Sequence, residues 1–145
     1  MAIGIASDHA GYELKKILIE HGFCLGITIY DFGCNNTESC DYPDFAHALG
    51  KWVDQLSQSR KGILICGTGI GMNITANRHP NVRAALCHST YDAEYSRKHC
   101  DANVICLGAR TTTAELAREF VNVFMNTPFE GGRHNNRVEK INKID

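Results

Sequence analysis

The sequence predicts an α/β fold, a three-layer sandwich in which helices cover a five-stranded parallel sheet. Two observations lead to this prediction. Short apolar runs rich in β-branched residues recur along the chain, and longer stretches with the periodicity of amphipathic helices lie between them. Strands that alternate with helices in this way form βαβ units, whose strands are parallel.

The individual elements follow from these runs. The expected strands are residues 2–6, 27–31, 62–66, 83–86 and 104–107. The expected helices are residues 12–21, 42–58, 71–77, 91–98 and 113–126. A helix follows each strand, and a connection of this length is what two parallel neighbours require.

The C-terminal part of the chain departs from this alternation. Gly131 and Gly132 interrupt the pattern, and residues 133–144 then predict one further helix with no strand after it. The apolar residues of this helix recur every three positions: Val138, Ile141 and Ile144. They form one stripe that needs a surface to pack on, and we expect the helix to dock on a partner subunit.

Composition limits the classes of protein to which the chain can belong. It has 145 residues, 43% of them apolar, which predicts one core and a single domain over residues 1–145. Its formal net charge is −1, so we expect neither nucleic acid nor an anionic membrane as a partner. No apolar run approaches the roughly 20 residues that span a bilayer, and no signal peptide is evident, so we expect a cytoplasmic protein.

The cysteines suggest neither disulfides nor a metal centre. There are seven, an odd number in a chain expected to be cytoplasmic, so most should be reduced thiols. No two have the C-x-x-C spacing that begins a zinc finger or ribbon. We therefore expect no structural metal.

Polar residues follow several predicted strands, at the edge where open parallel sheets bind ligands. The segments are residues 7–9, 66–71, 88–89 and 108–110. In the second, Cys66 ends a buried strand, and glycines at 67, 69 and 71 precede a helix. Glycines let backbone N–H groups approach a ligand closely, and a helix start can stabilise an anion. A tight turn with a core cysteine explains this loop alone equally well.

Other polar residues also have both a chemical and a structural interpretation. Asp8 and His9 offer a carboxylate and an imidazole at the predicted cleft, although an Asp at such a turn is more often a helix cap. His99 follows a predicted helix and can equally be a solvated helix-end cation. Arg133 and Arg137 are four residues apart, so both can reach one phosphate, and the alternative is an exposed basic face.

Taken together, these residues resemble the ribose-5-phosphate isomerase B family, with its galactose-6-phosphate isomerase relatives, along essentially the whole chain. The resemblance rests on ordered segments at the expected separations. They are SDHAG at 7–11, DYP at 41–43, ICGTGIG at 65–71, RKH at 97–99, NV at 103–104, GAR at 108–110 and EGGRHNNRV at 130–138.

The resemblance implies a Rossmann-like sandwich that interconverts ribose 5-phosphate and ribulose 5-phosphate without a metal or cofactor. It implies a homodimer with shared active sites, and it leaves open whether dimers pair into tetramers. Cys66 is implied as the base that moves a proton between C1 and C2, and His99 as the acid that opens the sugar ring. Asp8 and Thr68 complete the residues expected in catalysis. The residues implied to bind substrate are Asp8, His9, Tyr42, Gly67, Thr68, Gly69, Ile70, Gly71, Cys100, Arg110, Arg133 and Arg137.

Two positions depart from the family pattern. Cys100 stands where relatives usually have Asn, and a thiol is a poorer hydrogen-bond donor than an amide. Asn73 replaces a small hydroxyl residue. Isomerisation of galactose 6-phosphate or allose 6-phosphate is the alternative function. The rivals from other classes are a non-catalytic nucleotide- or sugar-phosphate-binding module and a thiol-dependent phosphatase. A phosphatase loop would need an Arg soon after Cys66, and residues 70–72 supply none.

Overall fold

The computed structural model describes residues 2–55 and 59–143, and its strands form one parallel sheet. The strands are β1 (Ala2–Ser7), β2 (Ile29–Asp31), β3 (Arg60–Cys66), β4 (Ala84–Leu86) and β5 (Val104–Gly108). Their order is β2-β1-β3-β5-β4, and each neighbouring pair is parallel. The strand order reverses between β1 and β3, so this pair is the topological switch point at which such sheets bind ligands.

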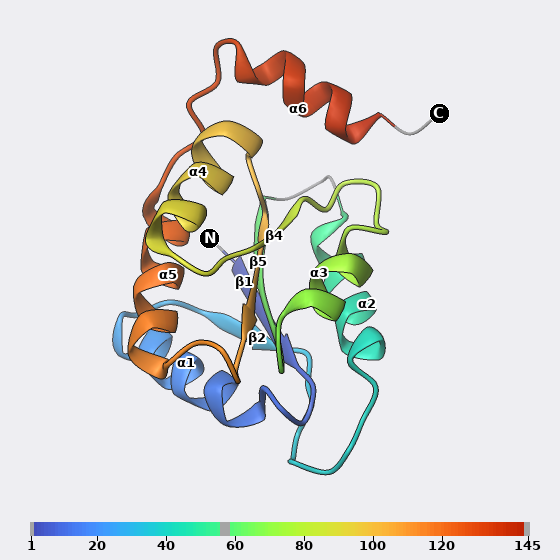
Figure 1. Cartoon of the computed structure of the whole chain (residues 1–145), viewed down its shortest axis with the longest axis vertical. Coiled ribbons are helices and arrows are strands. Elements are labelled where there is room, and N and C mark those ends of the chain that lie inside the picture. The colour runs from blue at the N-terminus through green and yellow to red at the C-terminus, as the bar shows by residue number, and fades with distance from the viewer. Residues whose placement is uncertain (1, 56–58, 144–145) are drawn as a thin grey trace.

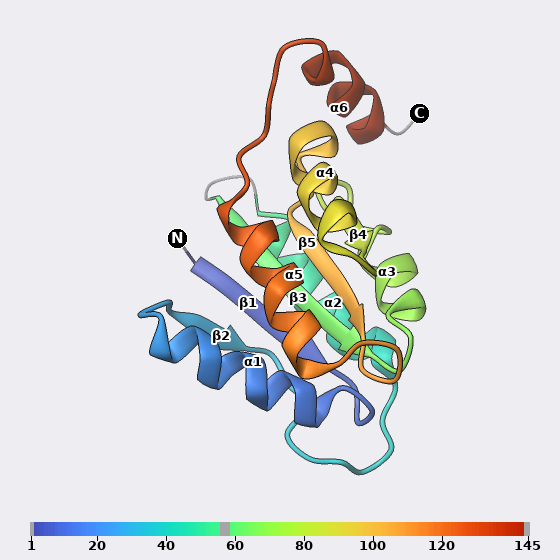
Figure 2. The ribbon, with the colours of Figure 1, turned by 60° about the vertical axis from the view of Figure 1, so that its left-hand side comes forward.

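Helices cover both faces of the sheet (Figures 1 and 2). They are α1 (Tyr12–Cys24), α2 (Tyr42–Val53), α3 (Ile70–Ala76), α4 (Thr90–Cys100), α5 (Ala114–Asn126) and α6 (His134–Asn142). Helices α1, α4 and α5 lie on one face, α2 and α3 lie on the other, and α6 lies beyond α4 at one end of the molecule. The predicted α/β sandwich with five parallel strands is confirmed.

The strand β3 explains why two separate cores form. Its side chains alternate between the faces, so Ile63 and Ile65 join a cluster with Phe120 of α5. Leu64 and Cys66 instead join the cluster beneath α2 and α3. A strand buried on both faces reads as a continuous apolar run, which is the pattern that predicted it. The thiol of Cys66 consequently faces the α2 and α3 side.

The helix expected over residues 42–58 is too long. Helix α2 ends at Val53, residues 54–55 are not helical, and residues 56–58 lie outside the described residues. Arg60 explains the early end of the helix. Its guanidinium donates hydrogen bonds to the Trp52 carbonyl at 2.9 Å and to the Gln55 side-chain oxygen at 2.7 Å. These contacts start β3 two residues before the expected position.

The strand β2 is shorter than expected because α1 is longer. Helix α1 continues to Cys24, and Gly26 then adopts a positive φ of 74°. The N–H of Ile27 closes the helix end by donating to the Gly22 carbonyl at 3.0 Å, so it is not free for the sheet. The remaining strands, α3, α4 and α5 differ from their expected bounds by one or two residues.

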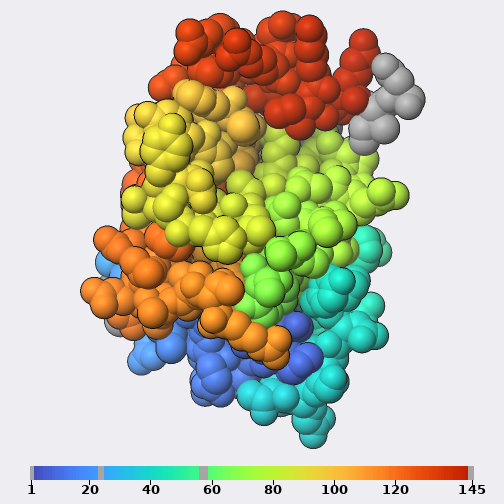
Figure 3. All heavy atoms as spheres, in the orientation of Figure 1, coloured from blue at the N-terminus to red at the C-terminus, as the bar shows by residue number. Residues whose placement is uncertain are grey.

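Helix α6 lies across one end of the molecule against α4 (Figure 3). Val138 is buried against the rest of this chain, whereas Ile141 is 53% exposed. Ile144, the third member of the predicted stripe, lies outside the described residues. One part of the stripe therefore packs within the chain, and docking of the rest on a partner stays a prediction.

Candidate active site

Most of the predicted binding residues lie at the carboxyl edge of the sheet. Asp8 follows β1, Cys66 ends β3 and Arg110 follows β5. The backbone ties these ends together, since the Asp8 N–H donates to the Ile65 carbonyl at 3.2 Å and the Arg110 N–H to the Gly67 carbonyl at 2.9 Å. We call the following residues the carboxyl-edge cluster: Asp8, His9, Tyr42, Cys66, Gly67, Thr68, Gly69, Ile70, Gly71 and Arg110.

Cys66 is held by the loop that follows it. Its side chain is buried, and its sulfur accepts a hydrogen bond from the Gly69 N–H at 3.1 Å. This geometry requires glycine at 69, where φ is +80° and a Cβ would lie 2.6 Å from Leu86 and 2.9 Å from the Leu107 backbone. A negative charge that developed on the sulfur would find a donor already in place.

Two further glycines allow large side chains to lie against the loop. A Cβ on Gly67 would lie 2.8 Å from Nη1 of Arg110, so the guanidinium rests on the loop backbone. A Cβ on Gly71 would collide with the ring of Tyr42, the first residue of α2. Both close approaches bring residues that the sequence predicted for binding to the loop around Cys66.

Asp8 and His9 are oriented by neighbouring backbone. The Asp8 carboxylate, 6% exposed, accepts the Gly11 N–H at 3.1 Å, so it does serve the turn into α1 as its structural interpretation predicted. Nδ1 of His9 accepts the Cys40 N–H at 3.2 Å. A neutral His9 ring therefore carries its proton on Nε2, which makes Nε2 a donor for a ligand.

The loop keeps several backbone donors free. Thr68 is exposed, and its hydroxyl accepts the Ile70 N–H at 3.3 Å. The Gly69 N–H is occupied by Cys66. Within the part of the chain that the structure describes, the N–H groups of Gly67, Thr68 and Gly71 have no hydrogen-bond partner.

A second group of predicted residues lies near the end of α4. His99 and Cys100 are its last two residues, and Arg133 and Arg137 lie at the start and on the first turns of α6. The segment that connects α5 to α6 is held against α4, because the Glu130 N–H donates to the Lys98 carbonyl at 3.2 Å. We call the following residues the α4–α6 cluster: His99, Cys100, Glu130, Arg133, His134 and Arg137.

Glu130 and His134 also belong to this cluster, although neither was among the predicted site residues. The His134 ring stacks on the His99 ring, with centroids 4.2 Å apart. Glu130 Oε1 lies 3.8 Å from Nε2 of His99 and 3.6 Å from Nε2 of His134. Burial lowers the pKa of His134, as do the charges of His99, Arg133 and Arg137, whereas Glu130 acts against them. The four-residue spacing of Glu130 and His134 was the available signal.

His99, Glu130 and His134 also form a possible metal-binding group. The ligand atoms of His99, Glu130 and His134 lie within 4.8 Å of one another, which makes this the group among the described residues that could hold a metal ion. Histidine nitrogens and a carboxylate are ligands that Zn²⁺ accepts. Cysteine spacing gives no signal for a site built from these residue types.

Arg133 and Arg137 are exposed and available. Neither side chain forms an ion pair or hydrogen bond with any residue in the ranges 2–55 and 59–143. Their charges both act on the buried His134 between them. This geometry suits either a phosphate clamp or a solvated basic face, the two interpretations that the sequence left open.

Within one chain the two clusters lie at opposite edges of the sheet. Helix α4 starts after the carboxyl end of β4 and runs back over 11 residues, a length of roughly 16 Å. Its last residue, Cys100, gives its carbonyl to Arg83 at 3.2 Å, directly before β4 begins. Figure 1 likewise shows α6 at one end of the molecule, beyond α4. A single chain therefore does not bring Cys66 and His99 together.

The sequence matches the model of a known protein family over almost the whole chain. The ribose/galactose isomerase family matches residues 3–141. The chain belongs to this family. Ribose-5-phosphate isomerase B of Escherichia coli is 38% identical over 143 residues, covering 99% of this chain and 95% of that protein. D-erythrulose-4-phosphate isomerase of Pectobacterium atrosepticum is 41% identical over 142 residues, covering 97% and 93%.

The solved structures agree with the family and the fold. Ribose-5-phosphate isomerase B from Mycoplasma genitalium with bound ribulose 5-phosphate superposes with a TM-score of 0.93 at 43% identity, covering 97% of this chain and 93% of that one. The chain is thus an isomerase of the ribose/galactose isomerase family with a Rossmann-like fold. Among the described helices, none has the length and apolar character needed to cross a membrane.

Proposed function

We propose that the chain interconverts ribose 5-phosphate and ribulose 5-phosphate, with Cys66 as the base at carbon. The observation that supports this most is the buried thiol at the switch point, whose sulfur already accepts the Gly69 N–H at 3.1 Å. Moving a carbonyl from C1 to C2 needs a base that takes a proton from one carbon and returns it to the other. Cys66 supplies one ionisable group in the middle of the cluster.

The free backbone donors of the loop suit the intermediate of this reaction. Removing the proton from C2 produces an enediolate, whose oxygens need hydrogen-bond donors fixed in advance. The N–H groups of Gly67, Thr68 and Gly71 are donors near Cys66 that no described residue occupies. We assign the enediolate oxygens to these groups, with Thr68 and Asp8 serving proton traffic between O1 and O2. Nε2 of His9, Tyr42 and Arg110 would hold the sugar.

The α4–α6 cluster supplies what the carboxyl edge lacks. His99 would open the furanose ring by protonating its oxygen, and the exposed guanidiniums of Arg133 and Arg137 would hold the phosphate. Because these residues lie at the other edge of their own chain, we propose a homodimer. Each site combines Cys66 of one subunit with the α4–α6 cluster of its partner. Cys100 would then contact the sugar in place of the usual amide.

The proposed substrate has five carbons, and one relative is named for a shorter sugar phosphate. The Pectobacterium relative is an isomerase of a four-carbon sugar phosphate, so the family does not fix the substrate. Galactose 6-phosphate and allose 6-phosphate are the alternatives with the same chemistry. The carboxyl edge and the arginines have the same roles in each case, and only the distance between C1 and the phosphate changes.

A substrate panel tests the proposal. The purified protein, dialysed against a strong chelator, is assayed for ketose formation from four-, five- and six-carbon aldose phosphates. We expect ribose 5-phosphate to have the highest kcat/KM and activity to survive the chelator. A higher kcat/KM on another sugar phosphate would reassign the substrate. Activity that is lost on chelation and restored by one divalent ion would assign the His99, Glu130 and His134 group to a metal.

A further inference from the structure

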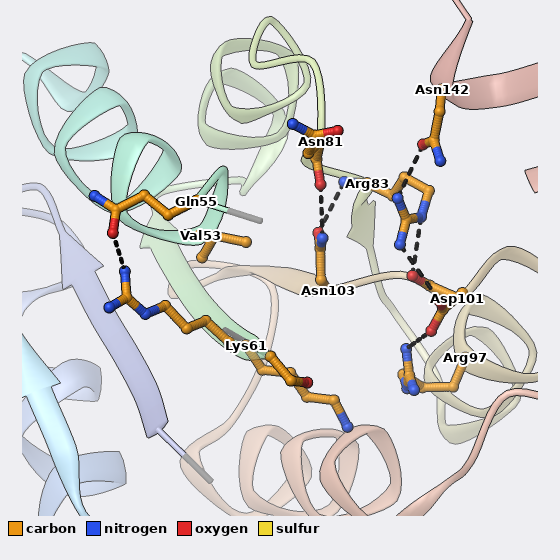
Figure 4. Close-up of a pocket in the computed structure, with 11 residues that line it drawn as sticks. Val53, Gln55, Lys61, Asn81, Arg83, Arg97, Asp101, Asn103 and Asn142 are labelled. Carbon is orange, nitrogen blue, oxygen red and sulfur yellow. Dashed lines mark hydrogen bonds and ion pairs between the residues drawn. The ribbon is translucent and has the colours of Figure 1, made fainter. Parts of the chain in front are cut away.

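The amino edge of the sheet carries a polar cavity that the proposed reaction does not use. Its volume is about 330 Å³, and it opens between the starts of β3 and β4, the ends of α2 and α4, and the end of α6 (Figure 4). Cys66 and its loop are at the opposite edge of the same strands. We call this cavity the amino-edge pocket.

The pocket walls are strongly positive in a chain with almost no net charge. Leaving aside Arg60, which has partners elsewhere, three cationic side chains line it, Lys61, Arg83 and Arg97, and among the described lining residues they face one carboxylate, that of Asp101. That carboxylate is shared, since Oδ1 lies 2.8 Å from Arg97 and Oδ2 lies 3.5 Å from Arg83. One carboxylate cannot neutralise this many cations, so the local charge favours an anion.

Lys61 is the least satisfied of these groups. It occupies a core-facing position on β3, in register with Ile3, and is only 8% exposed. Among the described residues its ammonium has no hydrogen-bond acceptor, and its nearest partner is the Phe124 ring, 5.9 Å away. Nζ itself is not fully enclosed by protein and reaches the pocket, so a bound anion would supply the partner that the described residues do not. Burial lowers the pKa of Lys61, as does the charge of Arg97, against the effect of Asp101.

Arg97 offers a second unclaimed donor beside Lys61. Its Nε donates to Thr127 at 3.1 Å, and its Nη1 donates to Asp101 at 2.8 Å and to Ala102 at 2.6 Å. Within the described ranges, Nη2 has no acceptor. Figure 4 shows Lys61 extending from β3 toward the side of the pocket where Arg97 lies. A fixed guanidinium next to an ammonium is an arrangement that suits phosphate oxygens.

We propose that the amino-edge pocket binds a small phosphate-bearing molecule, whose phosphate oxygens accept from Lys61 and from Nη2 of Arg97. The volume lies at the lower end of the range for small-molecule sites, so it admits a phosphate with a small body attached. The site is separate from the proposed isomerase site and does not depend on that function. Arg83 links it to the rest of the molecule, through the Cys100 carbonyl at 3.2 Å and the Asn142 side chain of α6 at 2.9 Å.

Binding of pyrophosphate, measured by calorimetry on the full chain, tests this site. Arg133→Ala/Arg137→Ala serves as the background, so that the proposed clamp for the substrate phosphate does not contribute heat. In that background we expect binding, and Lys61→Gln should weaken it about 10- to 100-fold, the loss of one charge-assisted hydrogen bond. Lys51→Gln on the exposed surface of α2 is the matched control and should leave binding unchanged.

Two outcomes would overturn the proposal. One is the absence of binding at millimolar pyrophosphate in the background protein. The other is equal affinity in folded Lys61→Gln, which would leave Lys61 as a lysine hydrated inside the cavity. If Lys61→Gln does not fold, NMR of the Lys61 side chain in the background protein decides. Bound pyrophosphate should raise its pKa, and an unchanged titration curve would refute the assignment.

Discussion

At the residue scale, the proposed chemistry depends on one sulfur atom. Cys66→Ala should lower kcat by at least about 10²-fold, the usual minimum contribution of a positioned base, with the fold retained. Cys106→Ala is a matched control, because Cys106 is a buried thiol in the same apolar cluster. It should keep its activity. Residual activity of Cys66→Ala above about one per cent of wild type, in a steady-state assay, would show that another group is the base.

Arg137 tests whether the exposed guanidiniums recognise phosphate. Arg137→Ala should weaken phosphate binding about 10- to 150-fold, because a charge-assisted hydrogen bond contributes roughly 1.5–3 kcal/mol. Thermal stability should hardly change, since the side chain has no partner among the described residues. Lys140→Ala, also exposed on α6, is the control. Activities on ribose 5-phosphate and on unphosphorylated ribose are compared, and an unchanged preference would mean a merely solvated basic face.

A histidine pair away from both clusters predicts how stability depends on pH. Nε2 of His79 lies 2.8 Å from Nδ1 of His47. The pKa of His79 is lowered from 6.5 by burial and then by His47, against Asp54. Above pH 6.5 both the folded and the unfolded chains hold His79 neutral, so it contributes nothing. Below that pH the unfolded chain binds a proton that the folded chain resists, so stability falls. The free energy of unfolding, measured with urea, should fall less on acidification below pH 6.5 in His79→Gln than in the wild type. Equal falls in the two proteins would contradict this.

At the element scale, local patterns predicted the strands and the loop but not the boundaries set by distant contacts. The apolar run of β3 and the glycines after it are local signals, and they correctly placed Cys66 at the switch point. The early end of α2 depends on Arg60, which belongs to the next strand, so no helical periodicity could reveal it. Glu130 lies near His99 only because the connection before α6 folds back against α4. The two residues are far apart in the sequence, so local patterns suggested the arginines and not this carboxylate.

Helix α6 is the element whose removal should affect activity and assembly together. Deleting residues after Gly132 removes both arginines and the Ile141 side chain, which is 53% exposed in this chain. We expect the truncated chain to lose activity and to dimerise more weakly, as measured by analytical ultracentrifugation. Ile141→Ser separates the two effects, since it should weaken the dimer and leave the arginines in place. An unchanged association constant for the truncated chain would show that α6 does not contribute to the interface.

At the scale of the whole molecule, the tendency of open parallel sheets to bind ligands beyond the carboxyl ends of their strands predicts one half of the proposed site and not the other. That tendency concerns the carboxyl edge of the sheet, where Cys66, Asp8 and Arg110 lie. His99 lies at the end of a helix that runs back to the amino edge. Only the resemblance suggested that His99 belongs to the same chemistry, and the distance within one chain makes a second subunit necessary if it does.

Mixing two inactive variants tests this arrangement directly. Cys66→Ala and His99→Asn homodimers should each be nearly inactive on ribose 5-phosphate. After they are mixed, unfolded together and refolded, about half of the dimers contain one copy of each variant. If sites are shared, one site of each mixed dimer combines the intact Cys66 of one subunit with the intact His99 of the other. About a quarter of wild-type activity should then return. If each chain builds its own site, every site carries one substitution and no activity returns. Wild-type protein taken through the same refolding supplies the reference activity, so a poor yield cannot be mistaken for an unshared site.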